Sequence, residues 1–292
     1  MDTLDFEHTR SYKELQRLLS FRMSNVGNIP RPEMANGPWN SLDWSLVWRD
    51  IMPRRLSKSP FACDASPDIV AQTGPSVKHS LMYDYRLNNR LDGLDVSLSA
   101  ELAGPPGDVG FAKCEGAASY NLPLFPATLG ALLHVSFHSG LVKAISFGGL
   151  CKESTCISDR FFVGGPLQLR GFQQSGIGPR AEIGGSLTPQ GDSLGGEIFY
   201  TSTVACSIPF PFNRSLRDAG FRCMCFGNVG TLSGWGVPMI PLIRSTRASV
   251  GAGITLSTTM GKMEATYSFP LRYGPRDIRQ QAQFGFGFVF GG

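Results

Sequence analysis

The chain has 292 residues, of which 17% are charged, and its formal net charge is only +4. Such a mild charge, with no Lys/Arg cluster interleaved with aromatic residues, argues against nucleic acid as a partner. The mean hydropathy is −0.04. The sequence contains no run of about 18 apolar residues, which a membrane helix would require. The start, MDTLDFEHTR, is acidic and polar and has the pattern of neither a secretory signal nor a transit peptide.

The predicted elements are mostly strands, because apolar and polar residues alternate along much of the chain. Residues 1–41 form a weakly specified amino-terminal segment with a possible helix or strand at 12–21, and a weak strand is possible near 60–72. Clear candidates follow at 42–49, 77–86, 94–102, 111–122, 129–142, 196–208, 219–228, 247–257, 262–269 and 281–290. Their lengths are close to the ~9–11 residues with which a tilted strand crosses a bilayer.

The last candidate strand shows the alternation most clearly. Ala282, Phe284, Phe286, Phe288 and Phe290 share one face, whereas amides, glycines and one valine occupy the other. Since a strand points successive side chains to opposite faces, one face requires an apolar environment and the other tolerates water.

Alternation alone fits two architectures: a soluble sandwich or barrel with its apolar faces inside, and a membrane barrel with its apolar faces outside. The 35 Gly, the 20 Phe and the low charged fraction favour the membrane barrel, in which only alternate strand residues are apolar. We therefore predict an all-β fold, a transmembrane antiparallel β-barrel formed by residues 42–292.

Motifs for catalysis or metal binding are weak. The seven cysteines form no CxxC pair, and His134 and His138 would lie about 13 Å apart in a strand, too far for one metal ion. Ser193 lies in a GxSxG pattern, but the apolar strand and the helix of a hydrolase elbow are missing around it. We predict that the chain is not an enzyme, with no catalytic residue, no metal and no cofactor.

Residues 150–195 lack clear alternation and contain a series of motifs. DRFFVGG at 159–165, RGF at 170–172, GIGPR at 176–180 and GDSLGGE at 191–197 occur in this order. The series resembles the central barrel subunit of the mitochondrial sorting and assembly machinery, which belongs to the superfamily of outer-membrane protein insertases that includes bacterial BamA. The resemblance extends over about residues 42–292 and is strongest from residue 159 onward.

The resemblance implies a function and a location. It implies insertion and assembly of β-barrel precursor proteins into the mitochondrial outer membrane, by an integral protein of that membrane. The implied partners are the precursors, peripheral subunits of the same machinery and membrane lipid. Family barrels have sixteen strands, whereas the sequence shows about eleven or twelve, so we expect a barrel that is short at its amino-terminal side.

In that family the RGF motif lies on a loop that folds back into the barrel lumen. The resemblance therefore implies that Gly164, Gly165, Arg170, Gly171 and Phe172 belong to an inward-folded loop at about 150–195. An arginine at this depth requires an acidic or backbone oxygen as its partner.

The partner of this arginine is expected to differ from the bacterial one. Bacterial relatives use acidic residues on the wall, and the matching positions here are Ala205 and Asn228. Glu197 is the substitute candidate, because Ile198 and Val204 assign the even positions to lipid and leave Glu197 facing inward.

The carboxyl end resembles the sorting signal of mitochondrial barrel proteins, in which a polar residue is followed by glycine and then by two hydrophobic residues. Gln283, Gly285, Phe288 and Phe290 fit this pattern. Family barrels open between their first and last strands, so the resemblance implies that these four residues lie at the seam.

Three other functional readings remain open at this point. A passive outer-membrane channel would share the barrel without needing the RGF loop. An inactive fragment of the insertase would carry the motifs but lack the first strands of the seam. A soluble β-sandwich binding module would use the same alternation with its apolar faces turned inward.

Overall fold

The computed structural model describes residues 12–24, 37–53, 65–89, 93–124, 130–182, 190–237, 239–258 and 261–288. Eleven strands form one sheet in chain order. They are β1 (Tyr12–Ser24), β2 (Gly37–Pro53), β3 (Gly74–Asn89), β4 (Leu94–Ala103), β5 (Phe111–Pro123), β6 (Leu132–Ala144), β7 (Ile198–Pro209), β8 (Phe221–Ser233), β9 (Arg247–Thr258), β10 (Gly261–Arg272) and β11 (Ala282–Phe288). The short helices are α1 (Pro67–Val70), α2 (Arg214–Asp218), α3 (Met239–Arg244) and a 3₁₀ turn at Ile157–Asp159.

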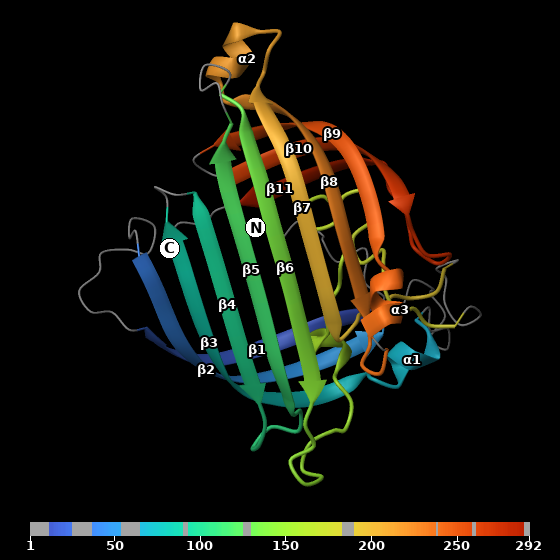
Figure 1. The fold of residues 1–292 in the computed structure, drawn as a ribbon. Coiled ribbons are helices and arrows are strands. Elements are labelled where there is room, and N and C mark those ends of the chain that lie inside the picture. The colour runs from blue at the N-terminus through green and yellow to red at the C-terminus, as the bar shows by residue number, and fades with distance from the viewer. Residues whose placement is uncertain are drawn as a thin grey trace.

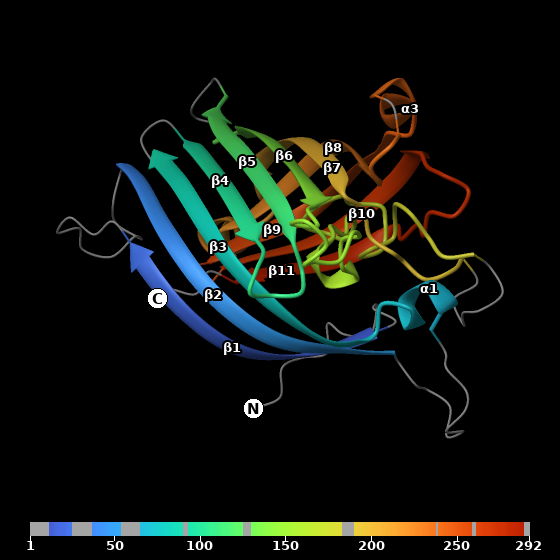
Figure 2. The same cartoon turned by 90° about the horizontal axis from the view of Figure 1, so that it is seen from below.

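Every neighbouring pair of strands is antiparallel, and each strand pairs with the next strand along the chain. The sheet curls strongly, as Figures 1 and 2 show. In the described part of the chain no ladder joins β1 to β11, so the curled sheet is a partial barrel with two edge strands. This confirms the prediction of an antiparallel barrel with fewer strands than a full family barrel.

The side chains alternate between an apolar outer face and a polar inner face. On the outer face, large apolar side chains are exposed, for example Leu98 at 52% and Phe284 at 57%. On the inner face polar side chains are buried, for example Ser249 at 1% and Thr255 at 5%. A soluble sandwich has the opposite arrangement, so this distribution identifies the outer face as the one that contacts lipid.

The longest connections all lie at one end of the sheet. The connection between β6 and β7 starts there, and its described residues, 145–182 and 190–197, fold into the curve of the sheet, where Figure 2 shows them between the two walls. We call these residues the inward loop. The opposite end carries shorter connections, including the one with α2 that projects beyond the sheet in Figure 1.

Two predicted boundaries differ from the structure. The sheet begins at Tyr12 rather than at residue 42, because residues 12–24 pair with 41–53 along their whole length. The possible strand near 60–72 is wrong within the described residues, since Pro67–Val70 form helix α1, with Pro67 at a favourable first position. The eleven strands among the described residues agree with the predicted eleven or twelve.

None of the described helices is long and apolar enough to cross a membrane. Met263, Ala265, Tyr267 and Phe269 of β10 point outward as the alternation predicts, and the residues between them are buried on the inner face.

We expect Trp probes on adjacent residues of β4 to report opposite environments. In vesicles of lipids brominated at the middle of their acyl chains, the Leu98→Trp variant should show strong quenching of the added fluorescence. The Ser97→Trp variant, whose side chain faces a lumen cavity of about 320 Å³, should show little. Equal quenching at the two positions would contradict an outer face in lipid, because a strand reverses its face at every residue.

Candidate functional site

The inward loop carries its own apolar core into a lumen whose walls are mostly polar. Loop residues Phe161, Val163, Leu169, Phe172 and Ile177 are all buried, at 6% exposure or less. They pack against apolar wall residues near the end of the sheet from which the loop enters: Ala103, Val109, Phe111, Val142, Phe199 and Leu232. Burial of each large side chain contributes about 1.5–3 kcal/mol, so the loop is a packed element of the fold.

The predicted Gly164-Gly165 pair forms the first half of a tight turn. Gly164 has φ +133°, and a Cβ placed there would lie 2.1 Å from the carbonyl oxygen of Gln173. No other residue type fits this position without movement of the backbone. The Leu169 amide donates to the Gly165 carbonyl at 3.1 Å, which closes the turn, and the Gly165 amide donates to the Phe172 carbonyl at 2.9 Å.

Arg170 forms a bidentate ion pair with Glu264 of β10. Its Nε and Nη2 atoms donate to the two carboxylate oxygens at 2.8 and 2.9 Å. Both side chains are buried, at 8% and 0% exposure. Paired donors and acceptors in one plane make this the strongest common form of charged contact between side chains.

The surroundings of Arg170 fix its backbone as well as its side chain. Its carbonyl oxygen accepts hydrogen bonds from Ser249 Oγ of β9 at 2.5 Å and from Asn228 Nδ2 of β8 at 3.2 Å. Its guanidinium lies 4.9 Å from the centre of the Phe226 ring, within range of a cation–π interaction. Four adjacent strands, β8 to β11, therefore hold the RGF motif.

The contact with β11 is made by Gln283. Its Oε1 accepts from the Gly171 amide at 2.9 Å, and its Nε2 donates to the Phe172 carbonyl at 2.7 Å. Gly171 has φ +90°, and a Cβ there would lie 3.1 Å from the Ser249 side chain. The two predicted sets of site residues, the RGF motif and the carboxyl-terminal signal, thus meet in the lumen.

Glu197 is not the partner of Arg170, and that prediction is wrong. Glu197 lies just before β7, at the end of the sheet where the loop enters. Its carboxylate accepts from Thr155 Oγ1 at 2.5 Å and from the Trp235 amide at 2.9 Å. These bonds join the loop to the β8–β9 connection, whereas Arg170 lies against the wall formed by β10.

The sequence contained a signal for the correct partner. Glu264 lies on the inward parity of the clearly alternating run 262–269, and an acid facing the lumen is expected to find a cation. Asn228 also faces Arg170, but its side-chain amide carries no charge and donates to the Arg170 carbonyl oxygen. Ala205 lines a cavity of about 400 Å³ beside the ion pair.

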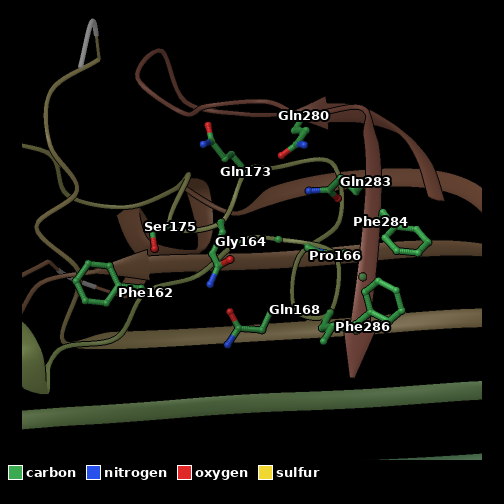
Figure 3. Close-up of a pocket in the computed structure, with 14 residues that line it drawn as sticks. Phe162, Gly164, Pro166, Gln168, Gln173, Ser175, Gln280, Gln283, Phe284 and Phe286 are labelled. Carbon is green, nitrogen blue, oxygen red and sulfur yellow. The ribbon is translucent and has the colours of Figure 1, made fainter. Parts of the chain in front are cut away.

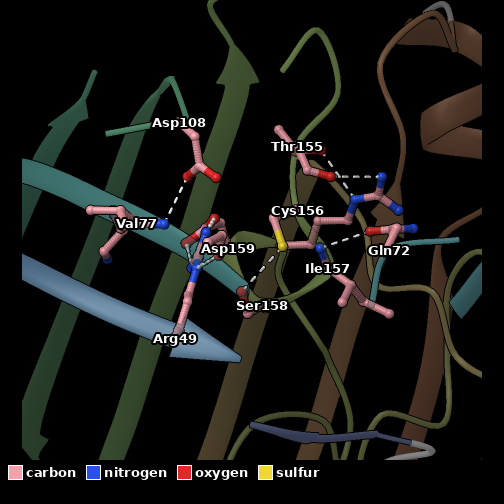
Figure 4. A network of polar contacts seen from close by, with 12 residues as sticks. Arg49, Gln72, Val77, Asp108, Thr155, Cys156, Ile157, Ser158 and Asp159 are labelled. Carbon is pink, nitrogen blue, oxygen red and sulfur yellow. Dashed lines mark hydrogen bonds and ion pairs between the residues drawn. The ribbon is translucent and has the colours of Figure 1, made fainter. Parts of the chain in front are cut away.

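A second buried ion pair, which the sequence analysis missed, joins the loop to the opposite side of the sheet. Arg49 of β2 donates through Nη1 and Nη2 to the carboxylate of Asp159 at 2.9 and 2.7 Å, and its Nε donates to Ser76 Oγ at 3.0 Å. The exposures of the two side chains are 2% and 4%. Figure 4 shows this pair beside the 3₁₀ turn.

Further contacts hold the remaining motifs in place. Asp192 accepts from the Ser66 amide at 2.7 Å, and Arg180 donates to the carbonyls of Gly191 and Ser175 at 2.9 and 3.2 Å. Burial lowers the pKa of the Arg180 guanidinium from its usual value, and the charges of Asp277 and Asp192 oppose that shift. The GIGPR and GDSLGGE motifs therefore hold the loop closed upon itself.

The loop also pairs with the segment that precedes β11. The amide of Gln173 donates to the Ile278 carbonyl at 3.0 Å, the Ile278 amide donates to Gly176 at 2.9 Å, and the Gln280 amide donates to Gly171 at 3.0 Å. The position of the last strand thus depends on backbone bonds to the loop as well as on its ladder with β10.

A cavity of about 500 Å³ lies between the loop and β11, and we call it the seam pocket. Figure 3 shows Gln283, Phe284 and Phe286 of β11 on one side of it and loop residues on the other. Gly285 also lines it. Phe288 pairs with Gly261 at the end of the strand, while its side chain and Phe290 lie outside what the structure describes.

The described residues offer no cluster of three or more His, Cys, Asp or Glu side chains that could hold a metal ion. His134 contacts Asn121 and His138 contacts Glu115. The absence of enzymatic activity stays a prediction. What the described residues can do is present a strand edge that pairs with none of them, beside a loop that is firmly fixed to the wall.

Comparisons with known proteins agree with this architecture. Residues 37–290 match the Omp85 superfamily domain. Sorting and assembly machinery component 50 homolog A of Xenopus laevis is 28% identical over 99% of this chain and 67% of its own length. The human homolog is also 28% identical, over 99% of this chain and 66% of its own. The structure of BamA from Haemophilus ducreyi lacking POTRA domains 1–3 matches with a TM-score of 0.71 at 19% identity, over 94% of this chain and 54% of that one.

The fold and the site define an outer-membrane barrel whose lumen holds a loop fixed by buried ion pairs. The chain belongs to the Omp85 superfamily. It spans about two thirds of the length of the curated relatives named above.

Removing the carboxylate of Glu264 should destabilise the protein strongly. We expect Glu264→Gln to lower the free energy of unfolding by about 3–5 kcal/mol, because Arg170 then remains buried without a counter-charge. Glu197→Gln, which keeps one acceptor oxygen, should cost about 1 kcal/mol. Urea unfolding of the protein in lipid vesicles, followed by Trp fluorescence, measures both; equal losses would contradict the assignment of Glu264.

The Arg49–Asp159 pair should show strong coupling in a double-mutant cycle. Arg49→Met and Asp159→Leu each leave one buried charge unpaired, so each should cost about 3–5 kcal/mol, while the double variant should cost much less than their sum. The exposed pair Arg214–Asp218 in α2, at 4.0 Å, is the control and should show no measurable coupling. Additive losses at Arg49 and Asp159 would contradict the role assigned to this pair.

Proposed function

We propose that this protein inserts and assembles β-barrel precursor proteins in the mitochondrial outer membrane. The observation that carries the proposal is the edge of β11, which is paired on one side only within the described residues and is fixed in place by the inward loop. Membership of the Omp85 superfamily and the names of the relatives support the same activity.

The edge of β11 offers backbone groups to an incoming strand. The Ser268 amide of β10 donates to the Gln281 carbonyl at 2.9 Å, which sets the ladder. Because backbone groups alternate in direction along a strand, residues 281, 283, 285 and 287 bond to β10, whereas 282, 284, 286 and 288 direct theirs away from β10. An extended precursor segment can add there as a new strand.

The driving force for assembly needs no cofactor. In hydrocarbon an unpaired backbone amide or carbonyl costs several kcal/mol, so a precursor gains free energy as its own strands close. The protein supplies a first strand edge that is already ordered, which removes part of the entropic cost of nucleating a sheet. The bonds between Gln283 and the RGF motif keep that edge in one conformation.

The proposed location and partners follow from the outer face and from the relatives. Exposed apolar side chains along the strands favour an integral protein of the outer membrane. The relatives are named as components of a sorting and assembly machinery, so we expect further subunits of such a machinery to bind this one.

A passive channel, the first alternative, needs a continuous water path along the lumen. Loop residue Leu167 lines the seam pocket and two further cavities of about 320 and about 400 Å³, so the loop occupies part of the lumen. This favours the insertase. An inactive fragment, the second alternative, has the same edge and differs from the insertase only in the assay below.

Blocking the open side of β11 should abolish insertion. In vesicles containing the full chain, a urea-denatured barrel precursor should fold faster than in empty vesicles, with folding read from its heat-modifiable gel mobility. Phe284→Pro removes an amide that faces the open side and keeps the ladder with β10, so we expect it to lose the acceleration.

Phe284→Ala is the matched control, because it removes the ring but keeps the amide. It should retain most of the acceleration. If the unmodified chain gave no acceleration, the inactive fragment would be the better description, and if Phe284→Pro worked as well as Phe284→Ala, the edge would not be the site.

A further inference from the structure

The cavity of about 400 Å³ beside the Arg170–Glu264 pair contains more cations than anions, and we call it the basic cavity. The charged side chains that line it belong to Arg170 of the loop, Arg222 of β8, and Lys262 and Glu264 of β10. The Glu264 carboxylate serves two of the cations, Arg170 at 2.8 Å and Lys262 at 3.5 Å. With His134 counted as neutral, the described lining therefore carries an excess of two positive charges.

The basic cavity lies toward the end of the sheet that carries α2 (Figure 1). Arg222 and Lys262 are each the second residue of a strand that starts at this end. Arg222 is paired with Thr255 of β9, which is paired with Glu264. Because neighbouring strands are about 4.8 Å apart, roughly 10 Å separate the backbones of Arg222 and Glu264. The Lys262 side chain is 47% exposed, so solutes can reach the cavity from this end.

Arg222 has no counter-charge among the described residues. Its Nε donates to Ser207 Oγ at 3.1 Å, and its Nη2 donates to the carbonyl oxygens of Ser207 and Gly130 at 3.0 and 2.7 Å. All three acceptors are neutral, and Nη1 makes no hydrogen bond to a described residue. A cation that is partly removed from water gains most from an anion. The Arg222 guanidinium thus has both the charge and a donor to offer to an anionic ligand.

The remaining polar lining of the cavity suits an anion with several oxygen atoms. Side chains that can donate hydrogen bonds come from β5, β6, β7 and β9: Asn121, Ser136, Thr203, Ser207 and Thr255. A guanidinium fork matches the oxygen atoms of a phosphate or a carboxylate, and an ammonium group adds a point charge beside it. A phosphate monoester carries a charge of about −1.5 to −2 at pH 7. It therefore balances the excess of two positive charges, which a single carboxylate would balance only by half.

We propose that the basic cavity is a binding site for a phosphate-type dianion, held by Arg222 and Lys262 with hydroxyl donors between them. This chemistry is shared by soluble phosphate compounds and by the phosphomonoester headgroup of an anionic lipid. The described lining of the cavity includes no residue of β11. The site is therefore separate from the open edge and does not depend on the proposed function.

Calorimetric titration with inorganic pyrophosphate tests the proposal. The full chain is placed in phosphatidylcholine nanodiscs, which leave both ends of the barrel accessible, and the ionic strength is held constant because salt screens the charges. We expect saturable binding to the unmodified chain. Arg222→Gln and Lys262→Gln should each weaken it by about tenfold or more, because each removes a charged partner of the ligand.

Lys78→Gln is the matched control, because Lys78 also faces the lumen but has a carboxylate of its own, Glu101 at 2.8 Å. It lowers the net charge of the chain by the same amount and should leave the affinity for pyrophosphate unchanged. Arg222→Lys keeps the charge and should bind more tightly than Arg222→Gln. Should Arg222→Gln fail to give the heat-modifiable gel mobility of a folded barrel, Lys262→Gln, at a half-exposed position, carries the comparison with Lys78→Gln.

Nanodiscs with added anionic lipid identify the source of the phosphate. Weaker pyrophosphate binding with phosphatidic acid, a monoester, than with phosphatidylglycerol, a diester, would assign the site to a lipid headgroup. Equal binding with the two lipids would assign it to a soluble phosphate compound. Absence of saturable binding to the unmodified chain, or equal losses in Lys262→Gln and Lys78→Gln, would overturn the proposal, since water and salt ions alone would then balance the positive charge.

Discussion

The structure depends on two buried Arg–carboxylate pairs at opposite flanks of an open sheet. Arg49 belongs to β2, next to the edge strand β1, and Glu264 belongs to β10, next to the edge strand β11. Their partners, Asp159 and Arg170, lie in the same loop, separated by a chain that reaches at most roughly 40 Å. A closed barrel fixes its diameter by pairing its first strand with its last. Here, among the described strands, the loop connects the two flanks and limits how far the sheet can uncurl.

Ion pairs serve this purpose better than apolar contacts would. A buried pair repays much of its desolvation cost only when its geometry is good, so it contributes little net free energy but tolerates almost no misplacement. The apolar cluster of the loop, with Leu169 and Phe172 fully buried, supplies the stability. The bidentate bonds to Arg49 and Glu264 fix the position of the loop relative to the strands. The loop is thus placed accurately beside β11, which is what a seam pocket requires.

The sequence predicted the parts of the structure that depend on local periodicity. Every strand from residue 42 onward was found by alternation, because in a membrane barrel the two faces meet different solvents. The place of Gly164 and Gly165 in an inward loop, and the meeting of Arg170 with an inward wall, followed from the resemblance that the motifs carry. The pairing of Arg170 with Glu264 did not follow from the sequence. It depends on how far the loop extends into the lumen, and the spacing of the motifs along the chain does not determine that distance. The Arg49–Asp159 pair joins residues 110 positions apart and depends on the curl of the whole sheet.

The same alternation also links the fold to the proposed function. Along β11 the inward residues Gln283 and Gly285 meet the loop and the outward residues meet lipid, so a segment that adds to the edge meets both environments at once. Lipid beside Phe284 and Phe286 favours apolar side chains on one parity. On the other parity the segment meets the loop, and the loop occupies that position because Arg170 is paired with Glu264. A change that released this pair would therefore alter the inner surroundings of the edge before it altered the outer face of the barrel.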